Sequence, residues 1–351
     1  MSKYLNFSEQ KMRWSAFALA ALAAFGVGRV YGWSSNGHQT VGAIADALIA
    51  GHRAAKQVAS ILGTAQGKQL TLSDVAVWAD CVRNVHPESG FTYDPGKFKE
   101  PACAIFEDDA GKAAMIDYAK RNNSNCEYDG KNMDCHKAFH FADIPMQHSA
   151  YKATFLGAND HDVVHAINAT LAVLQEQPAP APFDIASKKE ALMLLVHFVG
   201  DLHQPLHVAA MYLDQNGKIV DPESGVFDPK SDTHGGNSIG PASDNLHHRW
   251  DETKYVLTAG AAPSNLMKSA KAVPVQNVDI TDAPTVWASD TVVIARTKAF
   301  PGVKTGPFSD SSHSWPLTAD PKGRSKTQAT QVAKGGARLA ALLEALWPDE
   351  N

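Results

Sequence analysis

Two pairs of residues in this chain have the spacing and chemistry of metal ligands. His197 and Asp201 are four residues apart, as are His247 and Asp251. Residues four apart lie on the same face of a helix, so each pair presents an imidazole and a carboxylate together. Burying such groups without partners is costly, and pairing or a metal ion is the usual remedy. A histidine hydrogen-bonded to an aspartate in an ordinary core would explain one pair, but two pairs with His207 close behind favour a metal site.

Three more residues could complete such a site. His38 lies in or just before the first turn of a helical pattern, and His140 stands between Phe139 and Phe141, an apolar setting. If the chain is cleaved before Trp33, the new terminus lies five residues from His38 and offers an amine and a carbonyl as ligands. A lone histidine near a terminus is more often solvated, so His38 depends on the other ligands. Nitrogen and carboxylate ligands without thiolate suit zinc.

Asp80 and Arg83 are three residues apart in the helical pattern SDVAVWADCVR, for which Ser73 is the predicted cap. On its own, such a pair is more often an intrahelical ion pair. Beside the histidines, Asp80 becomes a candidate ligand. Arg83 becomes a candidate clamp for phosphoryl oxygens, because its planar guanidinium carries a fork of donors.

The element that must position these residues is a helix predicted to begin at Ser187. Ser187 and Glu190 have capping-box spacing, and neither Pro nor Gly interrupts the run before Gly200. Most sides of this helix are apolar, so we expect it to be buried at the centre of the fold. Further helical patterns lie near residues 111–121, 160–174, 284–298 and 334–346, and another begins near Ser243.

The composition is that of a globular protein. Of 351 residues, 44% are hydrophobic and 20% charged, and no half of the chain is rich in strand patterns. We find no internal repeat, no G-x-x-x-x-G-K phosphate loop and no G-x-S-x-G elbow. The length is ample for a large core in one domain or two, and helical patterns predominate along the chain.

Residues 1–32 have the features of a signal peptide. Lys11 and Arg13 precede an apolar run that is short for the roughly 20 residues of a membrane span. Val30 and Gly32 supply small residues for cleavage before Trp33. An uncleaved membrane anchor is the alternative. We expect a secreted or periplasmic protein without a membrane anchor after processing. The net charge of −5 becomes more negative on cleavage, so the surface does not attract polyanions by itself.

The four cysteines lie within one 55-residue window, and an even number in an exported chain favours disulfides over metal ligands. Three pairings are possible. We favour Cys81 with Cys103 and Cys126 with Cys135, because they close the two shortest separate loops. The region around residues 84–136 is then a disulfide-stapled insertion. Residues around 211–240 form a second insertion, rich in turn residues, for which we predict a hairpin plus a loop over the site.

Six motifs in order resemble the trinuclear-zinc nuclease family, which includes secreted single-strand nucleases and 3'-nucleotidases of fungi and plants and bacterial relatives. They are WSSNGH, WADCVR, HFAD, HFVGDLHQPLH, GGN and NLHHRWD. The late segments VWASDTVVIARTKAFPG and GGARLAALLEALW are also similar to that family. The resemblance implies a mainly α-helical fold, shared with zinc-dependent phospholipase C, as a single domain over residues 33–351. The helical patterns agree with this fold.

Carried over residue by residue, the resemblance implies three Zn²⁺ ions. One would be held by Asp80, His140, His197 and Asp201, and a second by Trp33, His38 and a bridging Asp201. The third would be held by His207, His247 and Asp251. Asp80 and Arg83 are the implied catalytic residues, because Asp80 could orient the attacking water and Arg83 could stabilise charge on the phosphoryl oxygens.

The resemblance also implies substrate-binding roles for Phe141, Asp143 and Asn237. Phe141 could stack on an unpaired base, with core packing as an equal alternative. The expected function is a monomeric, zinc-dependent endonuclease that cleaves single-stranded DNA and RNA to 5'-phosphate products and acts on 3'-nucleotides. A zinc-dependent phospholipase C and a non-catalytic zinc-binding protein are the rival hypotheses. The spacers from Asp80 to His140 and from His207 to His247 are longer than in the shorter fungal pattern.

Overall fold

The computed structural model describes residues 33–96, 99–124, 126–128, 131–132, 134–255, 257–320 and 322–350. The predicted signal peptide, with its alternative as a membrane anchor, lies outside these ranges. Across the described part of the chain, no helix combines the length and apolarity needed to cross a membrane.

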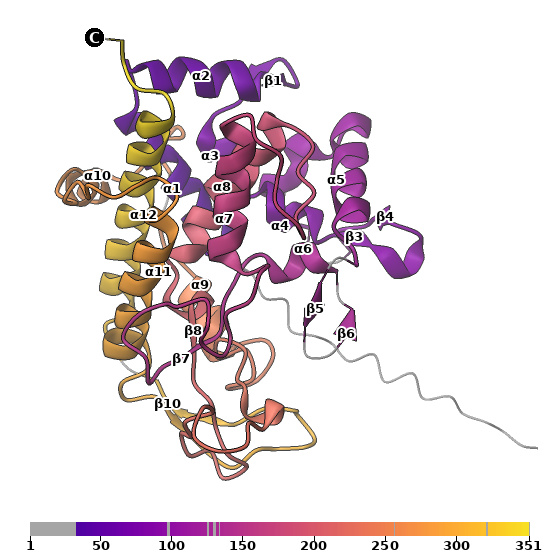
Figure 1. Cartoon of the computed structure of the whole chain (residues 1–351), viewed down its shortest axis with the longest axis vertical. Helices are drawn as coiled ribbons and strands as arrows, with labels where there is room; N and C mark the ends of the chain where they lie inside the picture. The colour runs from indigo at the N-terminus through magenta and orange to yellow at the C-terminus, as the bar shows by residue number, and fades with distance from the viewer. Residues whose placement is uncertain are drawn as a thin grey trace, which may run out of the picture.

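Helices dominate the regular structure, which confirms the predicted mainly α class (Figure 1). The α-helices are α1 (Ser35–Leu48), α2 (Arg53–Leu62), α3 (Leu72–Val75), α4 (Trp78–Val82), α5 (Asp109–Arg121), α6 (Cys135–Ala138), α7 (Val163–Leu174), α8 (Lys188–Leu202), α9 (Leu246–Asp251), α10 (Ser264–Lys271), α11 (Ala283–Ile294) and α12 (Arg324–Leu346). Short helical turns are η1 (Pro87–Ser89), η2 (Pro101–Phe106), η3 (Pro205–His207), η4 (Pro229–Ser231) and η5 (Ala295–Ala299).

The described strands are short and pair two by two. The antiparallel pairs are β1 (Thr64–Ala65) with β2 (Lys68–Gln69), β3 (Val85–His86) with β4 (Thr92–Tyr93), β5 (Glu127–Tyr128) with β6 (Lys131–Asn132), and β9 (Lys304–Thr305) with β10 (Leu317–Ala319). The one parallel pair among the described strands joins β7 (Ile144–Pro145) to β8 (Ala209–Ala210). This pair holds the segment after His140 beside the segment after His207.

Helix α8 lies at the centre of the fold, as its apolar pattern predicts. The Ser187 side chain accepts a hydrogen bond from the Glu190 backbone N–H, and the Glu190 carboxylate accepts one from Ala186. Every residue from Glu190 to Leu202 is buried. Figure 1 shows α8 between α12 on one flank and α4 and α5 on the other. Because helices surround it, α8 is a rigid support for His197 and Asp201.

Helices α1 and α12 pack closely because a glycine lies at their contact. A Cβ atom at Gly336 would come within 2.6 Å of the Ile44 side chain, which leaves no room for a larger residue. The helix predicted at 334–346 is present, but it is longer than predicted and begins at Arg324. Its contact with α1 fixes the helix that carries His38.

The helix predicted around Asp80 is two helices, and its cap is Thr71 instead of Ser73. Thr71 accepts from the Asp74 N–H, and the Asp74 carboxylate accepts from the Thr71 N–H. Ser73 instead donates its hydroxyl to the Gln39 carbonyl. The chain leaves helical hydrogen bonding between Val75 and Trp78, which makes the Ala76 carbonyl available to the site described below.

Two other predicted helix starts shift by a few residues. The helix expected from Asp160 begins at Val163, because the Asp162 carboxylate accepts from the Val164 and His165 N–H groups and acts as the cap. The helix expected near Ser243 begins at Leu246, where Asn245 is the cap. In both cases the helix starts directly after the residue whose side-chain oxygen accepts hydrogen bonds from the N–H groups of the first turn.

Both predicted disulfide pairs, Cys81–Cys103 and Cys126–Cys135, are formed. The first ties η2 to α4, and α5 packs against α4 beside it. Residues 211–240 contain no long hairpin in this structure. Single antiparallel bridges join Leu213 to Ile219 and Tyr212 to Asp232.

Candidate metal centre

Five buried polar side chains, here called the Asp201 cluster, meet inside the fold: His38, Asp80, His140, His197 and Asp201. Asp201 Oδ2 lies 2.9 Å from His140 Nδ1 and 3.1 Å from His197 Nε2. Asp201 Oδ1 lies 3.3 Å from His38 Nε2. Asp80 Oδ1 lies 3.8 Å from His197 Nε2. One carboxylate is therefore shared by three imidazoles, as a bridging ligand would be.

The orientation of His197 follows from the break between α3 and α4. Its Nδ1 lies 2.7 Å from the Ala76 carbonyl oxygen, which can only accept a hydrogen bond. Nδ1 therefore carries a proton and donates, and Nε2 faces Asp201 and Asp80. A backbone carbonyl that fixes the second ring nitrogen is typical of histidines that bind metals.

His38 reaches the cluster because α1 and α8 touch at Gly200. The His38 ring stacks on His197 with 3.9 Å between ring centroids. A Cβ atom at position 200 would lie 2.6 Å from His38 Nδ1. Glycine is therefore required one residue before Asp201, so that the His38 ring can occupy this space.

Trp33 is fully buried beside the same turn of α8. Its indole Nε1–H donates to the Gly200 carbonyl at 2.8 Å. The next residue, Ser34, donates its backbone N–H to the Asp251 carbonyl, also at 2.8 Å. The predicted mature terminus is thus attached both to α8, one residue before Asp201, and to the helix that carries Asp251.

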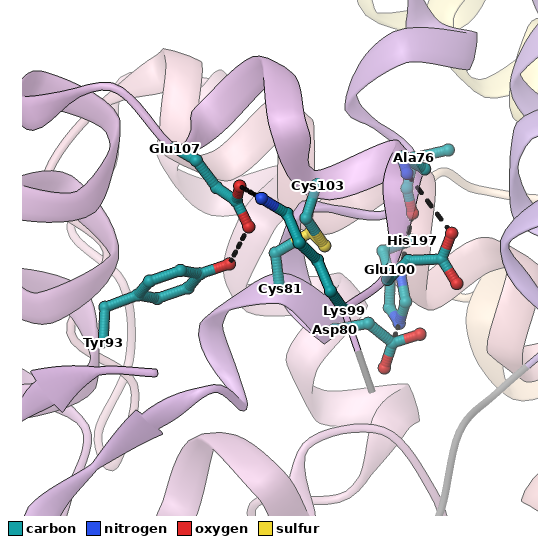
Figure 2. The surroundings of a disulfide bond; sticks show 10 residues. Ala76, Asp80, Cys81, Tyr93, Lys99, Glu100, Cys103, Glu107 and His197 are labelled. Atoms are coloured by element: carbon teal, nitrogen blue, oxygen red, sulfur yellow. Dashed lines mark hydrogen bonds and ion pairs between the residues drawn. A yellow bond between two sulfur atoms is a disulfide. The ribbon is translucent and has the colours of Figure 1, made fainter. Parts of the chain in front are cut away.

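Asp80 and Arg83 form the close pair that the sequence predicts, with Asp80 Oδ1 3.6 Å from an Arg83 guanidinium nitrogen. Both side chains are largely buried. The Cys81–Cys103 disulfide lies immediately beside Asp80 and connects α4 to η2 (Figure 2). On the far side of the disulfide, the Glu107 carboxylate accepts from the Tyr93 hydroxyl at 3.1 Å and pairs with Lys99 at 2.8 Å.

Removing the Cys81–Cys103 disulfide is expected to destabilise the fold at the helix that carries Asp80. The bond closes a loop with a sequence separation of 22, against 9 for Cys126–Cys135. By the chain-entropy model, C81A/C103A should lower the free energy of unfolding by about 3 kcal/mol, more than C126A/C135A. Urea unfolding of both double variants measures the difference. Equal stabilities would contradict this expectation.

A second buried set, here called the Asp251 group, comprises His207, His247 and Asp251. His247 Nε2 lies 3.6 Å from Asp251 Oδ2, across one turn of α9. Each histidine donates Nδ1–H to a backbone carbonyl: His207 to His140 at 2.8 Å and His247 to Gly235 at 2.9 Å. Their Nε2 atoms are thereby the nitrogens left for a ligand role. His207 Nδ1 also lies 3.5 Å from Asp201 Oδ1, which brings the two sets side by side.

The Gly-Gly-Asn segment approaches this group through its backbone. Gly235 has a φ of 58°, and a Cβ there would lie 2.2 Å from the Leu206 carbonyl oxygen. The Asn237 side-chain amide donates to the His234 carbonyl at 2.8 Å within its own turn. That bond uses one amide N–H, which leaves the second N–H and the amide oxygen for the predicted contact with substrate.

Asp143 is buried beside two residues that the sequence pattern did not place near it. One ligand atom each from Asp143, Asp232 and His234 lie within 4.8 Å of one another. Asp232 and His234 belong to the 211–240 insertion, and no spacing along the chain links them to Asp143. Phe141 is partly exposed, in keeping with either packing or a stacking role.

The electrostatics of the Asp201 cluster favour positive charge beside its carboxylates. Burial lowers the pKa of His197, but the charges of Asp201 and Asp80 outweigh it and raise the pKa to about 9. Burial raises the pKa of Asp201, but the charges of His197 and His207 outweigh it and lower the pKa well below its usual range. Burial lowers the pKa of His140 to about 4 and lowers that of His38 as well. Neutral His38 and His140 keep the lone pairs that a metal ion needs.

Unsatisfied polar atoms show that the donor set fits a bound cation. Both ring nitrogens of His38 and one oxygen each of Asp80 and Asp201 are buried with no hydrogen-bond partner among the described residues. Burial also raises the pKa of Asp251 well above its usual range. Unpaired acceptors of this kind are costly unless a positive charge compensates them. Nitrogen and carboxylate donors are ligands that zinc accepts.

Comparison with known proteins agrees with this chemistry. A family model described as S1/P1 Nuclease matches residues 33–347. Endonuclease 2 of Arabidopsis thaliana is 25% identical over 335 residues, 91% of each chain. Nuclease S1 of Aspergillus oryzae is 25% identical over 242 residues, 68% of this chain and 60% of the fungal protein. Endonuclease 1 of Arabidopsis thaliana is 25% identical over 236 residues, 60% of this chain and 69% of that protein.

Proposed function

Because the chain belongs to the S1/P1 nuclease family, we propose that it is a zinc-dependent endonuclease that hydrolyses phosphodiester bonds of single-stranded DNA and RNA. We include removal of phosphate from 3'-nucleotides in this proposal. The observation that carries it is the convergence of buried histidines and aspartates on the shared carboxylate of Asp201.

We propose three zinc ions. The Asp201 cluster, completed by the Trp33 amine and carbonyl, would hold two, and the Asp251 group would hold the third. Zinc bound in such sites supplies hydroxide at neutral pH and stabilises negative charge on phosphate oxygens. In the structure Asp80 contacts both His197 and Arg83, so it can serve as ligand while it keeps Arg83 at the edge of the cluster.

The roles of the remaining side chains follow from their chemistry. The Arg83 guanidinium would donate hydrogen bonds to the phosphoryl oxygens, whose charge grows during attack. Phe141 would stack on an unpaired base, which favours single strands because their bases are free to leave the stack. Asp143 would accept hydrogen bonds from the base, and Asn237 would hydrogen-bond the bound nucleotide. The products would carry 5'-phosphates.

We further propose that residues 1–32 are removed on export, so that the active protein is a monomer that begins at Trp33. It would act in the periplasm or the external medium, where its two disulfides are stable. Residues 33–351 would form one domain, with the insertions around 84–136 and 211–240 beside the cleft.

Metal content and chelation provide the first test. Protein that begins at Trp33 should contain about three zinc ions per chain by elemental analysis. It should cleave single-stranded DNA and RNA to 5'-phosphate ends, lose that activity with chelator and regain it with zinc. Zinc without cleavage of nucleic acid, but with hydrolysis of a choline phospholipid, would support a phospholipase instead. Absence of zinc would refute the ligand assignment.

A further inference from the structure

Gln204 lies between the two sets of candidate ligands and is fully buried. Its side-chain Nε2–H donates to Asp251 Oδ1 at 2.6 Å. Its backbone N–H donates to the Asp201 carbonyl at 2.8 Å, and its backbone carbonyl accepts from His207 at 3.0 Å. This one residue therefore contacts a member of the Asp201 cluster and two members of the Asp251 group.

The orientation of the Gln204 amide is determined by its other end. Oε1 accepts a hydrogen bond from the Leu206 backbone N–H at 2.6 Å. Only the oxygen of a side-chain amide can accept from an N–H group, so the NH₂ end must face Asp251. The amide thus presents a donor, never an acceptor, to the carboxylate.

We propose that Gln204 is a positioning residue for the metal ion held by the Asp251 group. Its amide donates a hydrogen bond to Asp251 Oδ1, while Asp251 Oδ2 faces His247 Nε2 at 3.6 Å. Without that donor, the Asp251 carboxylate is free to rotate, and Oδ1 loses its hydrogen-bond partner in a buried setting. Partners of this kind orient metal ligands, and their loss typically weakens metal binding by about 10- to 100-fold. This inference rests on the proposed zinc-dependent function.

Gln331 provides a matched control, because it is an equally buried glutamine on the neighbouring helix α12. Its Nε2–H donates to the backbone carbonyl of His203 at 3.0 Å, one residue before Gln204. Q331L therefore removes a buried amide hydrogen bond from the same turn without removing a bond to a ligand carboxylate. A merely structural role for Gln204 predicts the same behaviour for Q204L and Q331L.

The test compares zinc binding by wild-type protein, Q204L and Q331L. Zinc is titrated into metal-free protein against a competing chelator, and the zinc concentration for half-maximal cleavage of single-stranded DNA is measured in parallel. We expect Q204L to bind one of three ions about 10- to 100-fold more weakly, with the same shift in the cleavage titration. Q331L should match the wild type in both assays, although both variants unfold at lower temperature when metal-free.

Two outcomes would overturn the inference. One is binding of all three ions by Q204L with wild-type affinity, and the other is an equal loss of affinity in Q331L. If Q204L does not fold, Q204E retains the acceptor for Leu206 and nearly the same volume, and it should show the same selective loss at pH 8. A wild-type protein that binds no zinc would refute the proposed function itself, and the inference with it.

Discussion

Replacing Asp201 with asparagine is expected to prevent binding of the two zinc ions proposed for the Asp201 cluster and to reduce cleavage of single-stranded DNA by about 1000-fold or more. Asp201 is the carboxylate that His38, His140 and His197 share. An amide of the same shape lacks the negative charge that would bridge two cations. Water without a zinc ion has a pKa of about 16 rather than about 7, so hydroxide is no longer available near neutral pH.

The matched control is Asp46→Asn, because Asp46 is a mostly buried aspartate on α1 that serves the fold. Its carboxylate accepts from the Leu72 and Ser73 backbone N–H groups at 3.1 Å each, and burial raises its pKa to about 6. D46N should keep three zinc ions and near wild-type cleavage. Elemental analysis and initial rates for both variants decide the question. A D201N protein with full zinc content would show that Asp201 is not a bridging ligand.

Two ligand pairs of the candidate metal centre were predictable because their members lie close together in the sequence. His197 and Asp201 are four residues apart on one helix, as are His247 and Asp251, and helix geometry alone brings each pair together. The hydrophobic pattern likewise predicted that α8 lies at the buried centre, because a helix that is apolar on most sides has no polar face to expose to water. Family resemblance added the long-range grouping of these pairs with His38 and Asp80.

Interactions between distant segments were not predictable in the same way. The capping box of Thr71 and Asp74 is local, but the Leu72 and Ser73 N–H groups bond to the carboxylate of Asp46 from another helix. Nothing in the local pattern around Ser73 indicates that partner. The contact of Gln204 was not predictable for the same reason, since its partner Asp251 is 47 residues away. The grouping of Asp143 with the 211–240 insertion depends on how a loop folds back, which periodicity does not encode.

Adding one residue before Trp33 is expected to cost one zinc ion and to lower nuclease activity by about tenfold or more. An extension converts the Trp33 amine into an amide and moves the free amine about 3.8 Å along the chain. Trp33 cannot shift to compensate, because its side chain is fully buried and its indole is bonded to Gly200. The loss of a direct ligand should cost at least as much as the loss of an outer partner, which is about 10- to 100-fold.

A cleavable fusion makes this prediction specific to the terminus. The same preparation is assayed for zinc content and for cleavage of single-stranded DNA before and after a protease exposes Trp33, so that all other residues are identical. Because Ser34 bonds to the Asp251 carbonyl, the terminus should remain in place in both forms, and thermal unfolding of the metal-free proteins should be similar. Activity that rises with exposure of the amine supports a terminal ligand. Equal zinc content and equal rates in the two forms would instead mean that the cluster is complete without the Trp33 amine.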